Sequence, residues 1–175
     1  GGDRMTKQKL KVKRRGFWLV ESAVAIAVVG VGVVAVVGSH QAWHIQAVES
    51  EKLATGMRLA SEIREMSLLL PANDPITGSA TWGVELGEFI PADLDDLDDL
   101  DGAVFAEMDG TGPLDATGTT IIGMDGWEQR VQVQCVDPFD VTNVVPDGFS
   151  EVVRISVTVM CGTEEIARLT WIAPR

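Results

Sequence analysis

The element of this sequence with the clearest capacity for chemistry is an acidic run, residues 93–101 (DLDDLDDLD), in which six of the nine residues are aspartates. Hard cations such as Ca²⁺ bind clustered carboxylate oxygens, so Asp96, Asp98, Asp99 and Asp101 are candidate calcium ligands. Their spacing does not match the EF-hand pattern, and few acids follow to complete a site. In the alternative interpretation, the three leucines of the run share one face of a short helical turn and dock on the domain, while the aspartates point to water.

His40 and His44 are four residues apart, a spacing at which two imidazoles on a helix can share a metal ion. No glutamate follows His40 as in a zinc-protease helix, and histidines beside an apolar segment more often lie at a membrane interface. The sequence contains no glycine-rich phosphate loop after a strand and no nucleophile elbow, and two histidines leave few bases for a hydrolytic triad. We therefore expect no enzyme activity, no catalytic residues and no cofactor, with calcium as the one possible exception.

Glu21 is the only charged residue in the apolar segment 17–38 (FWLVESAVAIAVVGVGVVAVVG). A helix of this length rises about 33 Å, which is enough to cross a hydrocarbon layer of ~30 Å. A carboxylate in a membrane helix costs about 2.5–3.5 kcal/mol at mid-depth and somewhat less near the helix end. Glu21 is therefore expected to serve a function and to require a positively charged partner.

Basic and acidic residues are distributed unevenly around this segment. Seven of the fourteen Lys and Arg residues precede Phe17, whereas the chain beyond Gly16 has seven basic and twenty-five acidic residues, a net charge of −18. The positive-inside rule places the basic leader, residues 1–16, in the cytoplasm and the acidic body across the membrane. The acidic body is not expected to contact nucleic acid, because phosphate binding requires clustered Lys and Arg.

Residues 13–21 (KRRGFWLVE), followed by the unbroken apolar helix, resemble the processing signal of type IV prepilins and type II secretion pseudopilins. Four features coincide: a basic leader, Gly16 before the cut, Phe17 after it, and Glu21 as the fifth residue of the mature chain. The resemblance implies that a prepilin peptidase cuts between Gly16 and Phe17, and that the new N-terminus is methylated. It also implies that Glu21 meets the N-terminal amine of a neighbouring subunit, which would pair a charge otherwise buried alone in an apolar bundle.

The chain beyond the apolar segment begins as a continuation of the same helix. Residues 39–70 carry apolar side chains at helical intervals and Pro71 ends the pattern, which predicts one spine helix over residues 17–69. Residues 71–126 are rich in Gly, Pro, Asp and Thr and are expected to form a variable acidic loop region. Short elements are expected within that region at residues 82–86 and 119–122.

Residues 127–175 alternate apolar and polar side chains, which predicts an antiparallel sheet with one buried face. A turn at residues 162–164 would pair Val159 with Ala167, and pairing of the first two strands would place Cys135 near Val153, far from Cys161. Two buried thiols are therefore expected, with a disulfide as the alternative, since several members of the resembled family bridge such cysteines. The expected inward faces are Trp127, Gln129, Val131, Val133 and Cys135; Val153, Ile155, Val157, Val159 and Cys161; and Ala167, Leu169 and Trp171.

Together these patterns predict an α+β protein of the pilin fold, with a long N-terminal spine helix packed on a small C-terminal antiparallel sheet. The expected function is structural: a minor pilin or pseudopilin in a type IV pilus or a type II secretion filament, with the prepilin peptidase, other subunits and the bacterial inner membrane as partners. Its domain is expected outside the cytoplasm, first on the inner membrane and then in the pilus or periplasmic pseudopilus. The alternative is a signal-anchored single-pass protein whose extracytoplasmic domain binds a ligand; a third possibility is a filament used for adhesion or DNA uptake.

Overall fold

A computed structural model describes residues 15–76, 78 and 82–175. The side chains of residues 15–17 are not described, and residues 1–14 of the expected leader lie outside the described part. The chain divides into two compact units, Gly1–Val48 and Glu49–Arg175. Each unit is described by itself below.

The first element is a helix, α1, which runs over Arg15–Ser67 and so matches the predicted spine helix within two residues at each end. The helix ends at Ser67. Near this end, carbonyl groups accept hydrogen bonds from donors three residues further on: Ser67 Oγ donates to Arg64 O at 2.7 Å, and Leu68 N donates to Glu65 O at 3.2 Å. Pro71 then prevents the helix from resuming, as predicted.

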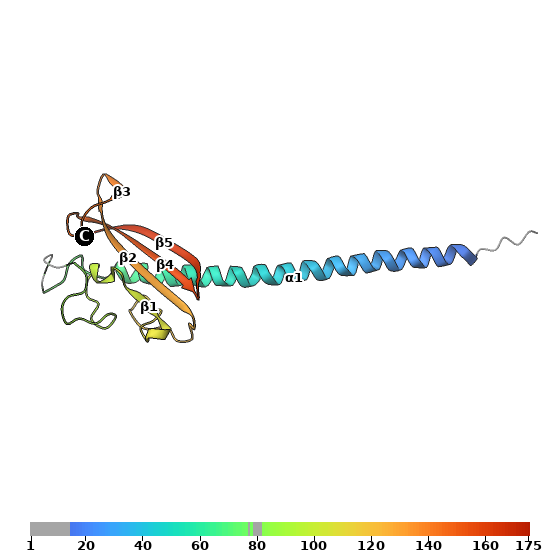
Figure 1. Cartoon of the computed structure of the whole chain (residues 1–175), viewed down its shortest axis with the longest axis horizontal. Coiled ribbons are helices and arrows are strands. Elements are labelled where there is room, and N and C mark those ends of the chain that lie inside the picture. Colours follow the sequence, from blue (N-terminus) through green and yellow to red (C-terminus); the bar gives the residue numbers. More distant parts are fainter. Residues whose placement is uncertain (1–14, 77, 79–81) are drawn as a thin grey trace, which may run out of the picture. The chain divides into compact units, whose positions relative to one another are not determined.

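Five strands form an antiparallel sheet in the second unit (Figure 1). Along the sheet the order is β1-β2-β4-β5, and β3 pairs with β2 off this path. Two short 3₁₀ turns, η1 (Asp98–Leu100) and η2 (Glu107–Asp109), lie in the loop region. The strands are β1 (Val104–Ala106), β2 (Trp127–Asp137), β3 (Asp140–Val144), β4 (Val152–Cys161) and β5 (Glu164–Pro174).

The three long strands and their registers confirm the prediction from alternation. Val159 pairs with Ala167 across β4 and β5, and Cys135 pairs with Val153 across β2 and β4. Cys161 lies opposite Trp127, at the other end of β2, and both cysteines are free thiols. Cys135 is buried as expected, whereas Cys161 is only half-buried.

The predictions for the loop region were less accurate. Residues 82–86 and 119–122 contain no strand or helix in the described structure, beyond a single bridge between Leu114 and Thr120. The actual additional strands are β1, where only Phe105 of three residues is buried, and β3, which is exposed throughout. Neither strand is long or amphipathic enough to produce a period of two in the sequence.

The hydrophobic core of the second unit lies between the C-terminal part of α1 and the inner face of the sheet (Figure 1). The helix and β5 approach closely at Gly56, where a Cβ atom would lie 2.9 Å from Ile166 Cγ2 and 3.1 Å from Ala167 Cβ. Each large aliphatic side chain buried here contributes roughly 1.5–3 kcal/mol. The core includes Leu59, Ala60, Ile63 and Met66 from α1; Val131, Val133, Ile155, Val157 and Val159 from the sheet; and Leu97, Leu100, Phe105 and Leu114 from the loop region.

Candidate functional site

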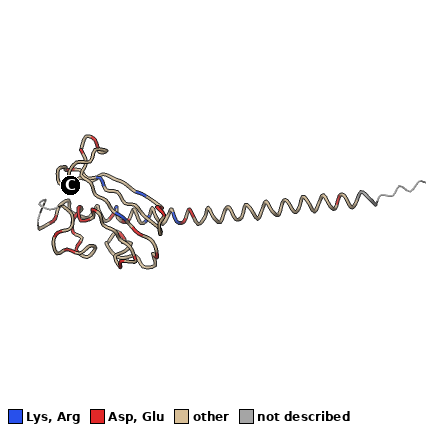
Figure 2. Tube along the Cα trace, in the orientation of Figure 1, with Lys and Arg blue, Asp and Glu red and all other residues tan. Residues whose placement is uncertain are grey.

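The apolar half of α1 is the first candidate site. Among the described residues, α1 is the one helix long and apolar enough to cross a membrane, and every side chain from residue 18 to 48 is exposed within its unit. Large exposed apolar surfaces on a protein mark contacts with other proteins or with lipid. In Figure 2 this stretch of the tube is almost entirely without charge, while the acidic positions gather in the loops of the second unit.

Glu21 is the only charged side chain within residues 18–38 of this stretch. Ser22 Oγ donates to Trp18 O and Ser39 Oγ donates to Ala35 O, each at 2.8 Å, so these two hydroxyls are satisfied by the backbone one turn earlier. The described residues provide no ion-pair partner for the Glu21 carboxylate. A counter-charge for this carboxylate would have to come from outside the described residues.

The two histidines of the same unit also lie on the exposed surface of α1. His40 and His44 stack with their ring centroids 5.4 Å apart. No third His, Cys, Asp or Glu joins them in any metal-sized group found among the described residues. Both histidines lie just beyond the apolar segment 17–38.

The second candidate site is the acidic loop region, where thirteen Asp and Glu residues occur between residues 71 and 126 without any Lys, Arg or His. The prediction that the leucines of the acidic run dock on the domain is confirmed, since Leu97 and Leu100 are buried and Leu94 is partly buried. The companion prediction that the aspartates point to water holds for the exposed Asp93 and is wrong for three others of the run. Asp96, Asp98 and Asp99 are 3 %, 3 % and 1 % exposed.

These aspartates are buried because the chain uses their carboxylates as local acceptors. Asp96 Oδ1 accepts the N–H groups of Asp98 at 3.0 Å and Asp99 at 3.1 Å, which holds the turn η1. Asp101 Oδ1 accepts the N–H of Val133 at 2.9 Å, and so joins the loop to β2. The four predicted calcium ligands therefore serve separate structural contacts and do not converge on one point.

Asp98 forms the one buried ion pair among the described residues. Its Oδ2 lies 3.7 Å from Arg175 Nη2, with both side chains less than one-tenth exposed, and it also accepts the N–H of Gly83 at 3.2 Å. The Arg175 guanidinium lies over the Trp82 ring, 4.9 Å from its centroid. A buried pair of this kind links the acidic run to the end of β5, and removal of either partner would leave an uncompensated charge.

The acidic environment changes how Asp96 ionises. Burial raises the pKa of its carboxyl to about 6, and the hydrogen bond to the Asp98 side chain and the charge of Asp98 act in the same direction. The backbone N–H donors of Asp99 and Asp98 oppose the increase in pKa but do not cancel it. As the pH rises, the unfolded chain, in which the carboxyl has its ordinary pKa of 3.8, loses this proton before the folded chain does. Between these two pKa values the folded chain holds the proton and the unfolded chain does not. The free energy of unfolding therefore decreases as the pH rises through this window.

The Asp96→Asn variant is expected to be more stable than the parent at about pH 7.5, by roughly 1–2 kcal/mol after solvent screening is taken into account. The amide oxygen can still accept the two N–H groups of η1, while the charge that costs free energy at this pH is absent. The advantage should disappear near pH 4, where Asp96 of the parent is protonated. Denaturant midpoints measured with a chelator at both pH values test this, with Asp109→Asn, an exposed site, as the control. An equal advantage at both pH values would contradict the prediction.

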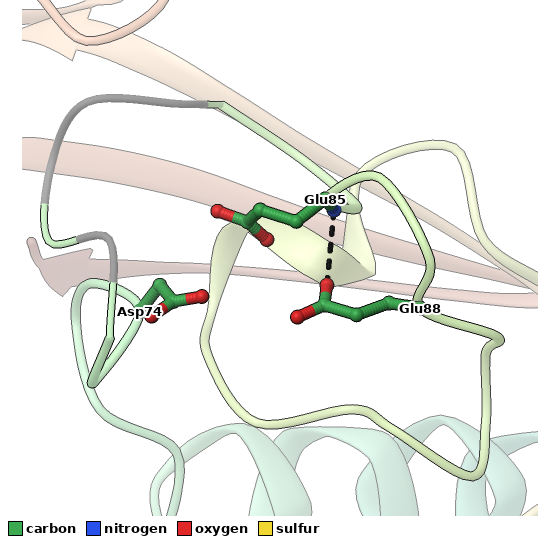
Figure 3. A group of neighbouring side chains, drawn as sticks. All are labelled: Asp74, Glu85 and Glu88. Atoms are coloured by element: carbon green, nitrogen blue, oxygen red, sulfur yellow. Dashed lines mark hydrogen bonds between the residues drawn. The ribbon is translucent and has the colours of Figure 1, made fainter.

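A different group of acids does converge. Carboxylate oxygens of Asp74, Glu85 and Glu88 all lie within 4.8 Å of one another, and Figure 3 shows the three side chains directed toward a common space. Asp74 is buried and the two glutamates are half-buried. Sequence reasoning missed this group, because two of its members are isolated acids in a loop and the third follows three residues after the second.

Local hydrogen bonds position these three side chains. Asp74 Oδ1 accepts the N–H of Ile76, and Asp74 O accepts the N–H of Gly78 at 3.0 Å. The N–H of Glu85 donates to Glu88 Oε2 at 2.9 Å, and the N–H of Glu88 donates to Glu85 O at 3.2 Å. Two tight turns, which the Gly and Pro content of the region favours, therefore bring the carboxylates together.

The pKa values of two carboxyls around this group are raised, first by burial and then by neighbouring negative charge. The N–H of Glu85 lowers the pKa of Glu88, but burial, the hydrogen bond to the Glu85 carboxyl and the charges of Glu85 and Asp99 outweigh it, and the net pKa is raised. Burial raises the pKa of Asp95, with the charges of Asp74, Glu85 and Asp93 adding to the effect. The negative charges of Glu85 and Asp99 thus act on the Glu88 carboxyl, and those of Asp74, Glu85 and Asp93 act on Asp95.

The outer face of the sheet is a third polar surface, with Arg130, Arg154 and Arg168 on it. Each guanidinium already has partners within the domain: Arg130 pairs with Glu128, and Arg168 donates to both Glu165 carboxylate oxygens at 3.1 and 3.0 Å. Arg154 donates to Gln134 Oε1 at 2.8 Å and to Val141 O at 3.1 Å. These partners reduce the capacity of the face to hold an anionic ligand.

In comparisons with known proteins, no family model, no curated protein and no solved structure matches this chain. Of the residues singled out from the sequence, Glu21 lies alone on the exposed apolar helix, and the processing residues Gly16 and Phe17 fall where only the helical backbone is described. The four calcium candidates are close in sequence but separate in role. The structure adds one group that the sequence did not predict, the converging carboxylates of Asp74, Glu85 and Glu88.

Proposed function

We propose that this chain is a filament subunit, a minor pilin or pseudopilin of a type IV pilus or type II secretion filament. The precursor is anchored in the inner membrane by α1, with the acidic domain outside the cytoplasm. A prepilin peptidase cuts it between Gly16 and Phe17, and the mature subunit then joins the filament through the apolar half of α1. The loop-rich domain favours a minor pilin or pseudopilin over a major pilin.

The observation that carries this proposal is the fully exposed surface of residues 18–48, which is apolar from residue 18 to 38 with Glu21 as the only charged side chain there. Such a surface must be covered, first by lipid and then by the helices of neighbouring subunits. A plain membrane anchor has no use for a carboxylate one turn from its start, because that group makes insertion costlier. A neighbouring subunit that presents a freshly cut N-terminal ammonium would supply the missing counter-charge.

The alternative function is a signal-anchored protein whose domain binds a ligand outside the membrane. The polar outer face of the sheet, with its three arginines, is the observation that favours it. The internal partners of those arginines weaken the case, since a ligand would have to displace Glu128 or Glu165. The filament interpretation accounts for Glu21, and the alternative does not.

Processing gives the most direct test of the proposed function. Co-expression with a prepilin peptidase is expected to shorten the chain by the leader, so that mass spectrometry finds a mature N-terminus at Phe17, methylated on its amine. Gly16→Leu should block the cut, because glycine before the cut is one of the four features of the resembled signal, whereas Gly30→Ala, in the same helix but away from the cut, should be processed like the parent. An intact leader on the parent chain in membranes that contain active peptidase would overturn the filament proposal and leave the anchored domain.

A further inference from the structure

We propose that the outer face of β2, β4 and β5 binds an acidic saccharide. The carboxylate of this ligand pairs with the Arg154 guanidinium, and its hydroxyl groups bond to the neutral polar side chains beside that arginine. The face lies within the second unit, where the three strands run side by side (Figure 1). A filament subunit and an anchored domain would both present this face, so the inference goes beyond the proposed function and does not depend on it.

The strand registers arrange the outward side chains of this face in rows across β2, β4 and β5. Three successive rows are Arg130, Thr158 and Arg168; Gln132, Ser156 and Thr170; and Gln134, Arg154 and Ile172. The first and third rows are four residues apart along a strand, which corresponds to about 13 Å. The central row has only hydroxyl and amide side chains, so guanidinium groups flank a neutral polar patch on both sides.

This face is also hollowed enough to hold a ligand. A cavity of about 630 Å³ lies on it, and Gln132, Arg154, Ser156 and Thr170 are among the lining residues. Sites for small molecules usually have volumes of about 300–1,000 Å³. The hydroxyls of Ser156 and Thr170 share a hydrogen bond of 3.1 Å. Because a hydroxyl has one donor and two acceptor positions, both groups keep hydrogen-bonding capacity for a ligand.

Arg154 is the cation that this cavity offers to an anion. Its Nη1 donates to Val141 O at 3.1 Å, and its Nη2 donates to Gln134 Oε1 at 2.8 Å. Both acceptors are neutral, and Arg154 has no ion-pair partner among the described residues. A guanidinium has five N–H donors, so three remain after these two bonds. The two bonds also hold the side chain in place, which reduces the entropy lost when a carboxylate binds.

The other two arginines add positive charge from the opposite side of the central row. Arg130 pairs with Glu128, and Arg168 pairs with Glu165. The registers place both glutamates beyond their arginines, on the side away from Arg154. A ligand that binds at Arg154 and the central row therefore displaces neither glutamate. These five charged residues leave one net positive charge on the face, in a body whose net charge is −18.

The chemistry of the lining favours an acidic saccharide over a protein or a neutral sugar. Amide and hydroxyl side chains both donate and accept hydrogen bonds, as sugar hydroxyls do. Protein interfaces depend on apolar and aromatic anchors at their centre, and the central row of this face has no apolar side chain. A neutral sugar would cover Arg154 without supplying a counter-charge, whereas a carboxylate can bind a guanidinium through two parallel hydrogen bonds.

The test titrates the full chain with a short oligogalacturonate, in micelles of a detergent without sugar headgroups. Calorimetry is run at about 0.15 M salt, where charges more than about 8 Å apart are largely screened, and should find saturable binding. Two probes of the same length separate the contributions to binding. A maltose oligomer has hydroxyls but no charge, and oligoglutamate has carboxylates but no hydroxyls. Each should bind at least about tenfold more weakly than the oligogalacturonate.

Two variants and a matched control make the result specific to the sheet. Arg154→Gln removes the charge and should weaken oligogalacturonate binding at least about tenfold. Thr170→Val keeps the shape of the side chain and removes its hydroxyl, so binding should weaken about threefold, a loss that a contact based on charge alone would not show. Arg64→Gln makes the same change as Arg154→Gln at an exposed position on α1 and should bind like the parent. The basic residues before Phe17 also attract anions, but the parent and all variants share them.

Binding that is unchanged in Arg154→Gln would overturn the proposal and assign the heat to the basic N-terminal residues. Equal binding of oligoglutamate would overturn it as well and indicate an acidic polypeptide as the ligand. A parent without saturable binding would also contradict the proposal. Should Arg154→Gln fail to fold, Thr170→Val decides the result, since it alters the same cavity without a change of charge. The processing test involves no saccharide, so the two proposals fail separately.

Discussion

The Glu21→Gln chain is expected to be inserted in the membrane and cut at Gly16 but to form few or no filaments, at least tenfold below the parent. Glutamine retains the size and hydrogen-bonding capacity of glutamate and removes its charge. In the proposed filament, the ammonium at Phe17 of one subunit lies in an apolar bundle beside Glu21 of its neighbour. Loss of the carboxylate leaves that ammonium buried without a counter-charge, at a cost of about 3–5 kcal/mol for each subunit.

The measurement is filament yield by shearing or by electron microscopy in a host that assembles the parent chain, alongside the mass of the mature subunit. Glu49→Gln is the matched control, because Glu49 is an exposed carboxylate on the same helix beyond the apolar stretch. It should assemble like the parent. Normal filaments from Glu21→Gln would remove the physical basis for the filament proposal, even if the leader were cut as expected.

Much of the fold could be predicted because local patterns encode it. A continuous apolar segment followed by helical intervals predicted α1, and Pro71 predicted its end. Alternation predicted β2, β4 and β5, and the tight turn after Cys161 fixed the register of β4 and β5, since a shift of one residue would turn every valine outward. In each case the signal lies within one segment or across one short turn.

The rest depends on contacts between segments that are distant in the sequence. Asp98 is buried because it pairs with Arg175, and the half-buried Asp101 is held at the sheet by the N–H of Val133. A charge run usually lies in water, and nothing within residues 93–101 indicates that these partners exist. Asp74, Glu85 and Glu88 were missed for the same reason, because their proximity depends on turns in a loop region without periodicity.

Gln129 is the most informative case of a residue whose position was predicted and whose role was not. Alternation placed it correctly on the inward face of β2, where an apolar residue is the usual occupant. It is fully buried, and its Oε1 accepts the N–H of Leu114 at 2.7 Å. Its Nε2 donates to Leu59 O at 2.8 Å and to Leu114 O at 3.0 Å. One amide thus joins α1, the loop region and β2, and satisfies the backbone of a buried loop residue.

Gln129→Leu is therefore expected to destabilise the protein by about 2–4 kcal/mol, although leucine is apolar and similar in size. The N–H of Leu114 would remain buried without an acceptor, and the Leu114 carbonyl would lose a donor; Leu59 O suffers less because it is also within α1. The shift in denaturant midpoint with an unchanged m value measures the effect. Gln132→Leu, an exposed position on the outer face of the same strand, should change stability by less than about 0.5 kcal/mol. A Gln129→Leu protein as stable as the parent would mean that the gain in apolar burial outweighs these hydrogen bonds, and that the loop region is held to the sheet by its leucines and Phe105 alone.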